Sequence, residues 1–339
     1  MKLATYSDGS RDGQLVVVSR DLSTAHYATG IAYRLQQALD DWNFMSPQLQ
    51  DLYDALNHGK ARHAFAFEPA QCLAPLPRAY QALSGAAYPS HVALLRAASG
   101  VEDAEGDASE PPLHQSASDF LLGACAPISA LLPDGWGIDF EAQLAAITSD
   151  VPRAATPEQG LDAVRLLMLA NGIRGRQRAL DALSGATNAR HKEPATAFSP
   201  VAVTPDELGN AWQEGRVHLA LQTSCNGRKM GLGDAGADMR WGFGQLVAHA
   251  ARTRRLGAGS IVLSGVVSHS GANKEGGGRE WPKGQHCMVE KRAVEILTDG
   301  AAKTGYLQAG DAVRIDMKGS NGQSMFGAIE QLVDEVVSQ

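Results

Sequence analysis

The sequence predicts an α+β fold that is rich in β-strands, and three observations support this. Glycine is abundant, with 36 residues, whereas aromatic residues make up only 6% of the 339. That composition suits a turn-rich protein better than a helical bundle. Residues 138–148 alternate apolar and polar side chains, as a half-buried strand does. Asn226-Gly227 and Asn321-Gly322 are dipeptides typical of tight β-hairpins.

Composition also limits the class of protein. The formal net charge is −7, which argues against a nucleic-acid binder because such proteins carry basic patches. No apolar run approaches the ~20 residues that cross a membrane, and the N-terminus lacks the apolar core of a signal peptide. The four cysteines form no Cys-x-x-Cys pair, so neither a zinc ribbon nor a disulfide framework is expected. We expect a soluble cytoplasmic protein with a small-molecule substrate and no nucleic-acid or membrane partner.

The chain is predicted to divide into a small N-terminal domain, residues 1–75, and a larger domain, residues 76–339. Residues 15–18 are an apolar strand candidate. Apolar residues recur at helical spacing over residues 32–57. The proline-rich passage from Pro69 to Pro77 marks the entry to the second domain.

Capping motifs predict where the helices of the larger domain begin and end. Thr156-Pro157-Glu158-Gln159 is a capping box with proline at the first helical position. It predicts a helix that runs through Leu169 and ends at Asn171-Gly172. Thr204-Pro205 repeats the cap before a second short helix. A last helix is predicted over residues 289–299, where Gly300 ends it.

Three further strand predictions complete the larger domain. Residues 260–265 are a short apolar run typical of a buried strand. Asn226-Gly227 joins two strands, and Asn321-Gly322 is predicted to join residues 312–318 to residues 323–329.

The strand around residues 139–143 is the first candidate site. Side chains two residues apart on a strand share a face, so Glu141 and Gln143 point the same way. Two neighbouring oxygen donors can hold Mg²⁺ or Ca²⁺, although alternating polar residues commonly just face water. The motifs GxxxxGK[ST], HExxH and GxSxG are absent from the sequence.

Several motifs, in the same order along the chain, resemble those of the fumarylacetoacetate hydrolase (FAH) family. They are DFEAQL from Asp139, PATAFSP from Pro194, SIVLSGVVS from Ser260 and GDAVRI from Gly310. The resemblance implies an FAH-type mixed β-roll C-terminal domain with a small N-terminal domain, usually as a homodimer. It also implies C–C bond cleavage beside a β-diketone, or decarboxylation or isomerisation of related oxo acids. In this family Mg²⁺ or Ca²⁺ is held by Asp, Glu, Glu and Asp, with help from a lysine and a threonine.

Placed on this sequence, the family's metal positions are partly changed. The first Asp and the first Glu match Asp119 and Glu141, but the second Glu falls on Gln143 and the second Asp on Gly172. The resemblance therefore implies either no cofactor or weakly bound Mg²⁺ or Ca²⁺ at Asp119 and Glu141. Alternatively, Arg174, at a position that is small in the family motif, neutralises Glu141 or Asp119 without a metal.

The family's catalytic positions are changed as well. The lysine falls on Glu193, or on Lys192 if the register slips by one residue, and the threonine falls on Val266. Arg176 keeps the arginine of the family's ND-x-S-x-R stretch. The predicted substrate-binding residues are therefore Arg174, Arg176, Gln143 and Val266.

Four residues are candidates for acid–base catalysis: Glu193, His191, His269 and Glu290. His191 and His269 flank two of the family's active-site positions, and an imidazole with a pKa near ~6.5 suits proton transfer. Glu290 matches a family acidic position near the pocket. Lone histidines are more often structural, so the alternative for each is a packing role.

Three functions fit these patterns. The first is a divergent FAH-family enzyme with weak or no metal dependence, acting on an enolisable oxo acid or β-diketone-like substrate. Its reaction would be C–C bond hydrolysis, decarboxylation, or a repurposed condensation or cyclisation. The second is a non-catalytic FAH-fold protein that binds a ligand or partner. The third is an ordinary Mg²⁺- or Ca²⁺-dependent hydrolase of the FAH type.

Overall fold

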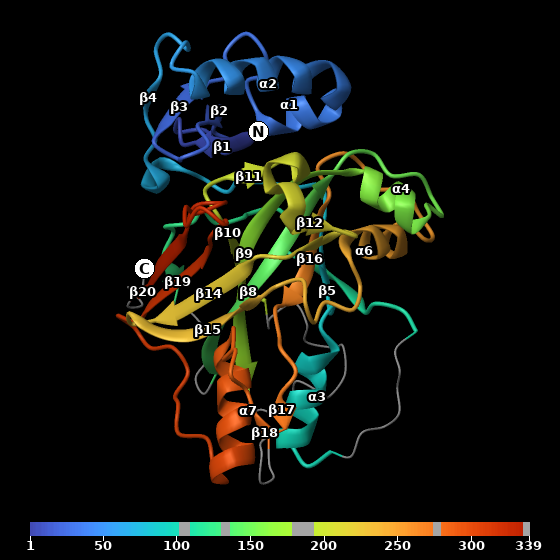
Figure 1. The fold of residues 1–339 in the computed structure, drawn as a ribbon, viewed down its shortest axis with the longest axis vertical. Coiled ribbons are helices and arrows are strands. Elements are labelled where there is room, and N and C mark those ends of the chain that lie inside the picture. The colour runs from blue at the N-terminus through green and yellow to red at the C-terminus, as the bar shows by residue number, and fades with distance from the viewer. Residues whose placement is uncertain (102–108, 130–135, 178–192, 274–278, 335–339) are drawn as a thin grey trace.

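The structure, a computed structural model, describes residues 1–101, 109–129, 136–177, 193–273 and 279–334. Most strands of two sheets occupy the middle of the molecule, and helices α1 and α2 lie at one end beside the N-terminal strands (Figure 1). Helices α3 and α7 lie side by side at the opposite end (Figure 1). The sheet-rich architecture with few helices confirms the predicted α+β, β-rich class.

The larger sheet has eleven strands within the described residues. Its strands are β1 (Lys2–Tyr6), β2 (Gln14–Val18), β3 (Thr24–Tyr27), β4 (Phe65–Ala66), β5 (Ala82–Gly85), β6 (Leu113–Ser116), β8 (Trp136–Thr148), β9 (Val164–Gln177), β10 (Ala195–Phe198), β11 (Ala202–Val203) and β16 (Ile261–Val266). Because β1 pairs with β11, the N-terminal strands continue directly into the sheet around β8 and β9.

The second sheet packs beside the first and has five strands in the described part of the chain. These are β7 (Ile128–Ser129), β14 (Ala220–Cys225), β15 (Arg228–Asp234), β19 (Ala312–Met317) and β20 (Ile329–Asp334). Two short ribbons pair β12 (Trp212–Gln213) with β13 (Arg216–Val217), and β17 (Ala272–Asn273) with β18 (Arg279–Glu280). The helices are α1 (Leu35–Asp40), α2 (Trp42–Asn57), α3 (Pro89–Ala98), α4 (Pro157–Asp162), α6 (Phe243–Ala250) and α7 (Met288–Asp299), with 3₁₀ turns η1 (Pro69–Gln71) and η3 (Pro205–Ala211).

Several local predictions are confirmed. The strands predicted at 15–18 and 260–265 are β2 and β16, and Asn226-Gly227 turns β14 into β15. The predicted last helix is α7, which ends at Gly300 with φ 81°, a left-handed conformation that glycine adopts without strain. The stretch 32–57 is helical as predicted, although it divides into α1 and α2.

The helix predicted from Thr156 to Asn171-Gly172 is largely wrong. The capping box forms, with Thr156 and Gln159 bonded reciprocally, but α4 ends at Asp162 and β9 begins at Val164. The apolar run Leu166–Leu169 is fully buried between β8 and β11. Such a run fits a buried strand as well as a helix, and sheet pairing decided the outcome.

The hairpin predicted at Asn321-Gly322 is also longer than expected. Gly322 does lie in a turn, with φ 78°, but β19 pairs with β20, whose first residue is Ile329. The segment 318–328 is therefore a connection, and the second strand starts six residues later than predicted.

Residues 138–148 form part of β8, but the prediction of a half-buried strand is wrong. Both faces of β8 are buried from Ile138 onward, including Asp139, Glu141 and Gln143. Its polar face is covered by other parts of the protein instead of water, so these polar groups must find partners inside the molecule.

No helix within the described ranges has the length and apolar character needed to cross a membrane.

Candidate functional site

One face of the β8–β9 pair changes from apolar to charged along its length. The antiparallel register places Glu141 opposite Gly172 and Asp139 opposite Arg174, so the side chains that alternate with these positions share a face. At one end this face carries Ala145, Ile147, Leu166, Met168 and Ala170, which pack in the core beneath the N-terminal strands. At the other end it carries Asp139, Glu141, Gln143, Gly172, Arg174 and Arg176.

Glu141 lies at the centre of the charged end. Its Oε2 accepts hydrogen bonds from Arg174 Nε at 2.8 Å and Gln143 Nε2 at 3.0 Å, and its Oε1 pairs with Arg176 Nη2 at 2.5 Å. Burial raises the pKa of Glu141, but Arg174, Arg176 and His91 together outweigh burial and hold the pKa well below its usual range. Glu141 is therefore ionised, and both of its oxygens are occupied by donors.

Glu193, just before β10, extends this cluster to β6. Its carboxylate pairs with Arg174 Nη1 and with His114 Nε2, the latter at 2.5 Å, and accepts a hydrogen bond from Ser116 Oγ at 2.9 Å. Burial, followed by the charge of Arg174, lowers the pKa of His114. A neutral His114 therefore donates through Nε2 to Glu193. The His114 side chain is 47% exposed, so the cluster reaches solvent on this side.

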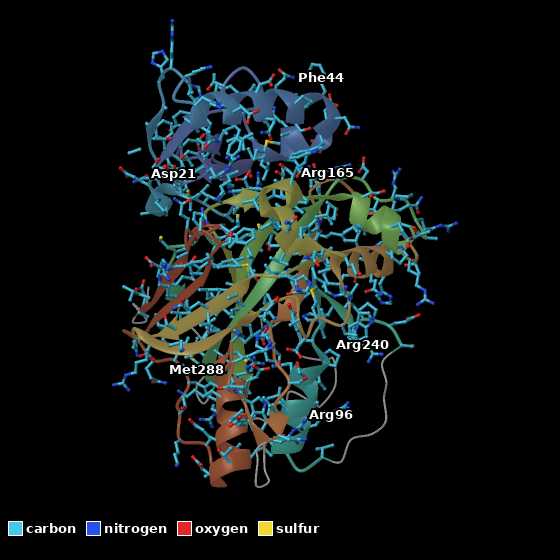
Figure 2. All side chains as sticks on the ribbon, in the orientation of Figure 1. Asp21, Phe44, Arg96, Arg165, Arg240 and Met288 are labelled. Atoms are coloured by element: carbon cyan, nitrogen blue, oxygen red, sulfur yellow. The ribbon has the colours of Figure 1, made fainter. Side chains whose placement is uncertain are left out.

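Asp139 connects the cluster to α7. Its carboxylate accepts hydrogen bonds from the backbone N–H groups of Met288 at 2.6 Å and Val289 at 3.0 Å, and it pairs with Arg176 Nε at 3.0 Å. Figure 2 shows Met288 at the end of α7 that faces the sheets. A carboxylate at a helix N-terminus is favourable, so Asp139 holds the first turn of α7, and with it Glu290, close to β8.

Glu290 forms a second carboxylate–histidine pair. His91 Nδ1, from the first turn of α3, lies 2.9 Å from Glu290 Oε1. Glu290 is buried, whereas the His91 side chain is 17% exposed. The Cys287 thiol completes a group with them, because ligand-type atoms of the three residues all lie within 4.8 Å of one another.

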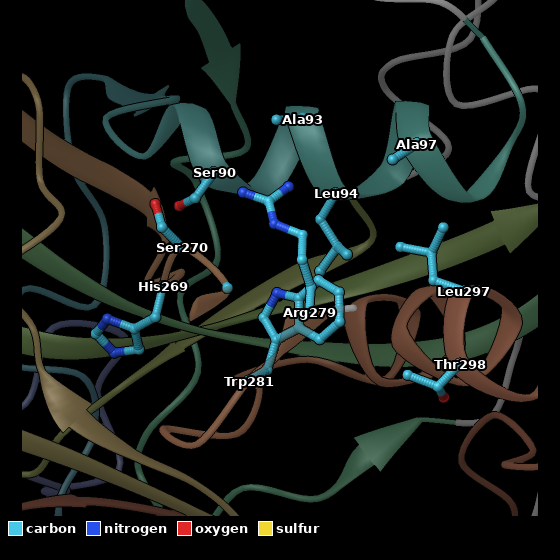
Figure 3. Close-up of a pocket in the computed structure, with 11 residues that line it drawn as sticks. Ser90, Ala93, Leu94, Ala97, His269, Ser270, Arg279, Trp281, Leu297 and Thr298 are labelled. Atoms are coloured by element: carbon cyan, nitrogen blue, oxygen red, sulfur yellow. The ribbon is translucent and has the colours of Figure 1, made fainter. Parts of the chain in front are cut away.

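His269 lies apart from these contacts. Its Nδ1 bonds to Asp238 Oδ2 at 2.9 Å and its ring packs edge-on against His286. The ring borders a cavity of about 300 Å³ between α3, α7 and the β17–β18 ribbon. Figure 3 shows the ring turned away from Arg279 and Trp281, which line the centre of the cavity. His269 Nε2 is buried and makes no hydrogen bond with a described residue, so the catalytic role of His269 stays a prediction.

Of the remaining predicted site residues, only some lie close to the charged face of β8 and β9. Val266 pairs with Gln143 between β16 and β8, so it adjoins the charged face. Asp119 is exposed and lines another cavity with Asp12, Arg34 and Arg78. It makes no hydrogen bond or ion pair with Glu141. His191 lies outside the described residues.

Sequence reasoning missed four residues of the site: His91, His114, Asp139 and Cys287. Asp139 had a usable signal, because it shares the alternation of Glu141 and Gln143. The proline at the start of α3 could have placed His91 in the first turn of a helix. Nothing in the local sequence marks its pairing with Glu290, 199 residues away, or that of His114 with Glu193, 79 residues away.

Buried carboxylates, guanidiniums and histidine pairs gathered at one end of a strand pair favour an enzyme over a purely structural protein. Sequence profiles agree with the fold. The profile for the fumarylacetoacetase N-terminal domain 2 matches residues 1–78, and that for the fumarylacetoacetate (FAA) hydrolase C-terminal region matches residues 82–334. The chain belongs to the fumarylacetoacetate hydrolase family, whose members are hydrolases and isomerases that act on carbon–carbon bonds.

Solved structures share the fold at low sequence identity. Fumarylacetoacetate hydrolase from Exiguobacterium antarcticum is 18% identical, with a TM-score of 0.65 over 99% of this chain and 100% of that one. Maleylpyruvate hydrolase from Sphingobium sp. SYK-6 is 14% identical, with a TM-score of 0.65 and the same coverage. That enzyme in complex with manganese(II) and pyruvate is 15% identical, with a TM-score of 0.63 over 99% of this chain and 100% of that one. No curated protein sequence matches the chain significantly.

Proposed function

We propose that this protein hydrolyses a carbon–carbon bond in an enolisable oxo acid or β-diketone-like substrate, with Arg174 and Arg176 in place of a divalent cation at Glu141. The observation that carries the proposal is that both oxygens of Glu141 accept from donors, two of them guanidinium groups. Membership of the family supports the reaction class, and the substrate class remains part of the proposal.

The residues around Glu141 do not fit a divalent cation. Mg²⁺ needs free carboxylate oxygens, whereas those of Glu141 face two positive charges and an amide N–H. Gly172 supplies no side-chain ligand. A divalent cation about 4 Å from one guanidinium would be repelled by roughly 8 kcal/mol at an effective dielectric of ~20, twice the value for two unit charges. No step of the proposed reaction therefore passes through a metal at this position.

The two arginines retain donors for a substrate. Each guanidinium has five N–H groups, of which Arg174 uses Nε and Nη1 and Arg176 uses Nε and Nη2 with described carboxylates. The remaining N–H groups can bind the oxygens of an oxo acid and stabilise the negative charge that develops on them. Gln143 Oε1, buried and without a hydrogen bond to a described residue, can accept from a substrate hydroxyl.

Proton transfer falls to the carboxylate–histidine pairs. When the Glu290 carboxylate accepts a hydrogen bond from Nδ1–H of a neutral His91, the lone pair of the imidazole is on Nε2. This nitrogen can then take a proton from water. The partial exposure of His91 allows water to reach it. Glu193 with His114 is the alternative pair, because it borders both Arg174 and solvent.

The test is turnover of an acylpyruvate and β-diketone panel, including maleylpyruvate and fumarylacetoacetate, by purified protein with and without EDTA. We expect turnover that persists in EDTA and falls about 10²–10³-fold in Arg176→Leu, the usual loss for an electrostatic stabiliser. Turnover that requires added Mn²⁺ in the wild type, and that Mn²⁺ no longer activates in Glu141→Gln, would contradict the proposal.

A non-catalytic binding protein is the second candidate. The observation that favours it is that Arg174 and Arg176 already form ion pairs with carboxylates of the chain. These are Asp139, Glu141 and Glu193. It predicts that oxo acids from the panel raise the melting temperature without being consumed. Arg176→Leu would abolish that rise.

A further inference from the structure

His91, Cys287 and Glu290 form a compact group of unlike ligands beside the site. We propose that they form a binding site for Zn²⁺. The imidazole and carboxylate are already in contact, with His91 Nδ1 2.9 Å from Glu290 Oε1. The three ligand atoms all lie within 4.8 Å of one another. Small side-chain rotations would bring them to the ~2.0–2.3 Å metal distances that zinc adopts with nitrogen, oxygen and sulfur.

The fold holds two of the three ligands in position. Cys287 is the N-cap residue of α7, and Glu290 lies three residues later in its first turn, so both can face the same side of the helix. The backbone of Cys287 is bridged to that of Glu141, and Asp139 binds the next two backbone N–H groups. His91 approaches from α3, which packs against α7 (Figure 1).

The chemistry of the donors selects zinc over the hard cations. A thiolate and an imidazole suit Zn²⁺, whereas Mg²⁺ and Ca²⁺ prefer oxygen ligands. Three protein ligands leave a fourth position for water or another small ligand, as in open zinc sites. Cys287 and Glu290 are buried, so the open side faces His91, whose side chain is 17% exposed.

The charge balance also admits a cation. Asp139, Glu141 and Glu193 carry three negative charges and Arg174 and Arg176 two positive ones, so the adjacent group has a net charge of −1. When Zn²⁺ binds, the Cys287 S–H bond breaks, the Zn–S bond forms and the proton passes to solvent. The thiolate and the Glu290 carboxylate then neutralise the metal.

Zinc at this position has one consequence for the proposed reaction. It takes the lone pair of His91 Nδ1 and an oxygen of Glu290, so the hydrogen bond that orients His91 is lost. Zinc should therefore inhibit turnover. This consequence rests on the proposed function, whereas the existence of the site does not.

The experiment measures zinc directly. Metal-stripped protein is titrated with Zn²⁺ in competition with a chromophoric zinc indicator, and with Co²⁺ as a spectroscopic probe. We expect one equivalent of Zn²⁺ and a thiolate-to-cobalt absorption band. In Cys287→Ser the band should vanish and zinc affinity should fall by at least about 100-fold. Removing a residue that only hydrogen-bonds to a metal ligand already costs up to about 100-fold in metal affinity, and Cys287 is a ligand itself. Cys125→Ser, which removes an exposed thiol, is the control.

Zinc binding of equal strength in wild type and Cys287→Ser, or a cobalt spectrum without a thiolate band, would overturn the site. Glu290→Gln provides a second test if Cys287→Ser is poorly folded by circular dichroism, and it should also weaken zinc binding. If wild type binds zinc through Cys287 but its turnover is unaffected, the zinc site stands and the role of His91 and Glu290 in proton transfer is wrong.

Discussion

Arg174 Nε donates to Glu141 Oε2 at 2.8 Å across the β8–β9 pair, and both side chains are buried. The same guanidinium also pairs with Glu193, which lies just before β10, so one positive charge joins two carboxylates from different parts of the chain. The resemblance to the family predicts a small residue at this position and further carboxylates at the positions of Gln143 and Gly172. The arginine therefore provides, from the chain itself, a positive charge next to Glu141.

Removing this charge should destabilise the protein strongly. Arg174→Leu would leave Glu141 with only Arg176 and would deprive Glu193 of its cation. Breaking a buried ion pair by removing one partner costs about 3–5 kcal/mol, and we expect a loss of that size in the free energy of unfolding from urea titration. Arg252→Leu is the control, because Arg252 pairs with Glu110 at the surface, where such pairs contribute ~0–1 kcal/mol. Equal losses in the two variants would show that the buried pair carries no special weight.

Reversing three substitutions should create a metal site. We expect Gln143→Glu, Gly172→Asp and Arg174→Ser together to bind Mn²⁺ in a calorimetric titration, because they supply two carboxylates and remove one guanidinium. A side chain at position 172 would place its Cβ 2.7 Å from Gln143 Nε2. The residue at 143 must therefore move, which a shared cation would favour.

Gln143→Glu alone is the matched control for the triple variant. It retains Arg174, so its added carboxylate should pair with the arginine and leave Mn²⁺ affinity near that of wild type. Should the triple variant bind Mn²⁺ no more tightly than wild type, the placement of the family's metal positions on residues 143 and 172 would be wrong.

The backbone conformation could be predicted from the sequence where a single residue type determines it. Gly300 ends α7, and Asn226-Gly227 turns β14 into β15, because left-handed backbone at those positions is easily adopted by glycine and asparagine. The run Leu166–Leu169 carried no such signal. Its strand conformation depends on pairing with β8, which local sequence does not encode.

The candidate site, too, could be predicted from the sequence only in part. Alternation correctly placed Glu141 and Gln143 on one face, but it could not show that this face is buried. Nor could it show which histidines meet the carboxylates. Glu193 and Glu290, both predicted, are partnered by His114 and His91 through tertiary packing of β6 and α3.

The pairing of His91 with Glu290 leads to a kinetic prediction. His91→Gln removes the basic Nε2 but keeps a polar side chain, so we expect kcat to fall by about 10²–10⁴-fold, the usual contribution of a general base. The melting temperature should change little, because His91 is partly exposed. His58→Gln, at an exposed residue near the end of α2, is the control and should leave kcat unchanged. A fall in kcat matched by the control would argue against a specific role for His91.

His286 should make stability depend on pH. Burial, and then the neighbouring His269, lowers the pKa of His286 to about 3, whereas an unfolded histidine has a pKa of about 6.5. Between these values the unfolded chain binds a proton that the folded protein does not. The contribution of a neutral His286 is therefore complete above pH ~6.5 and is lost as pH falls toward 3, by up to about 1.4 kcal/mol per pH unit.

Carboxylates also titrate in this range, so the informative quantity is the difference between variants. We expect His286→Gln to flatten the fall in the free energy of unfolding between pH 6.5 and 4.5, because glutamine takes up no proton. The site is tight, since a Cβ at Gly231 would lie 2.8 Å from His286 Nδ1. The variant should therefore lose stability at neutral pH while gaining relative to wild type in acid. His58→Gln should track the wild-type slope. Parallel curves for wild type and His286→Gln would mean that His286 is protonated in the folded protein.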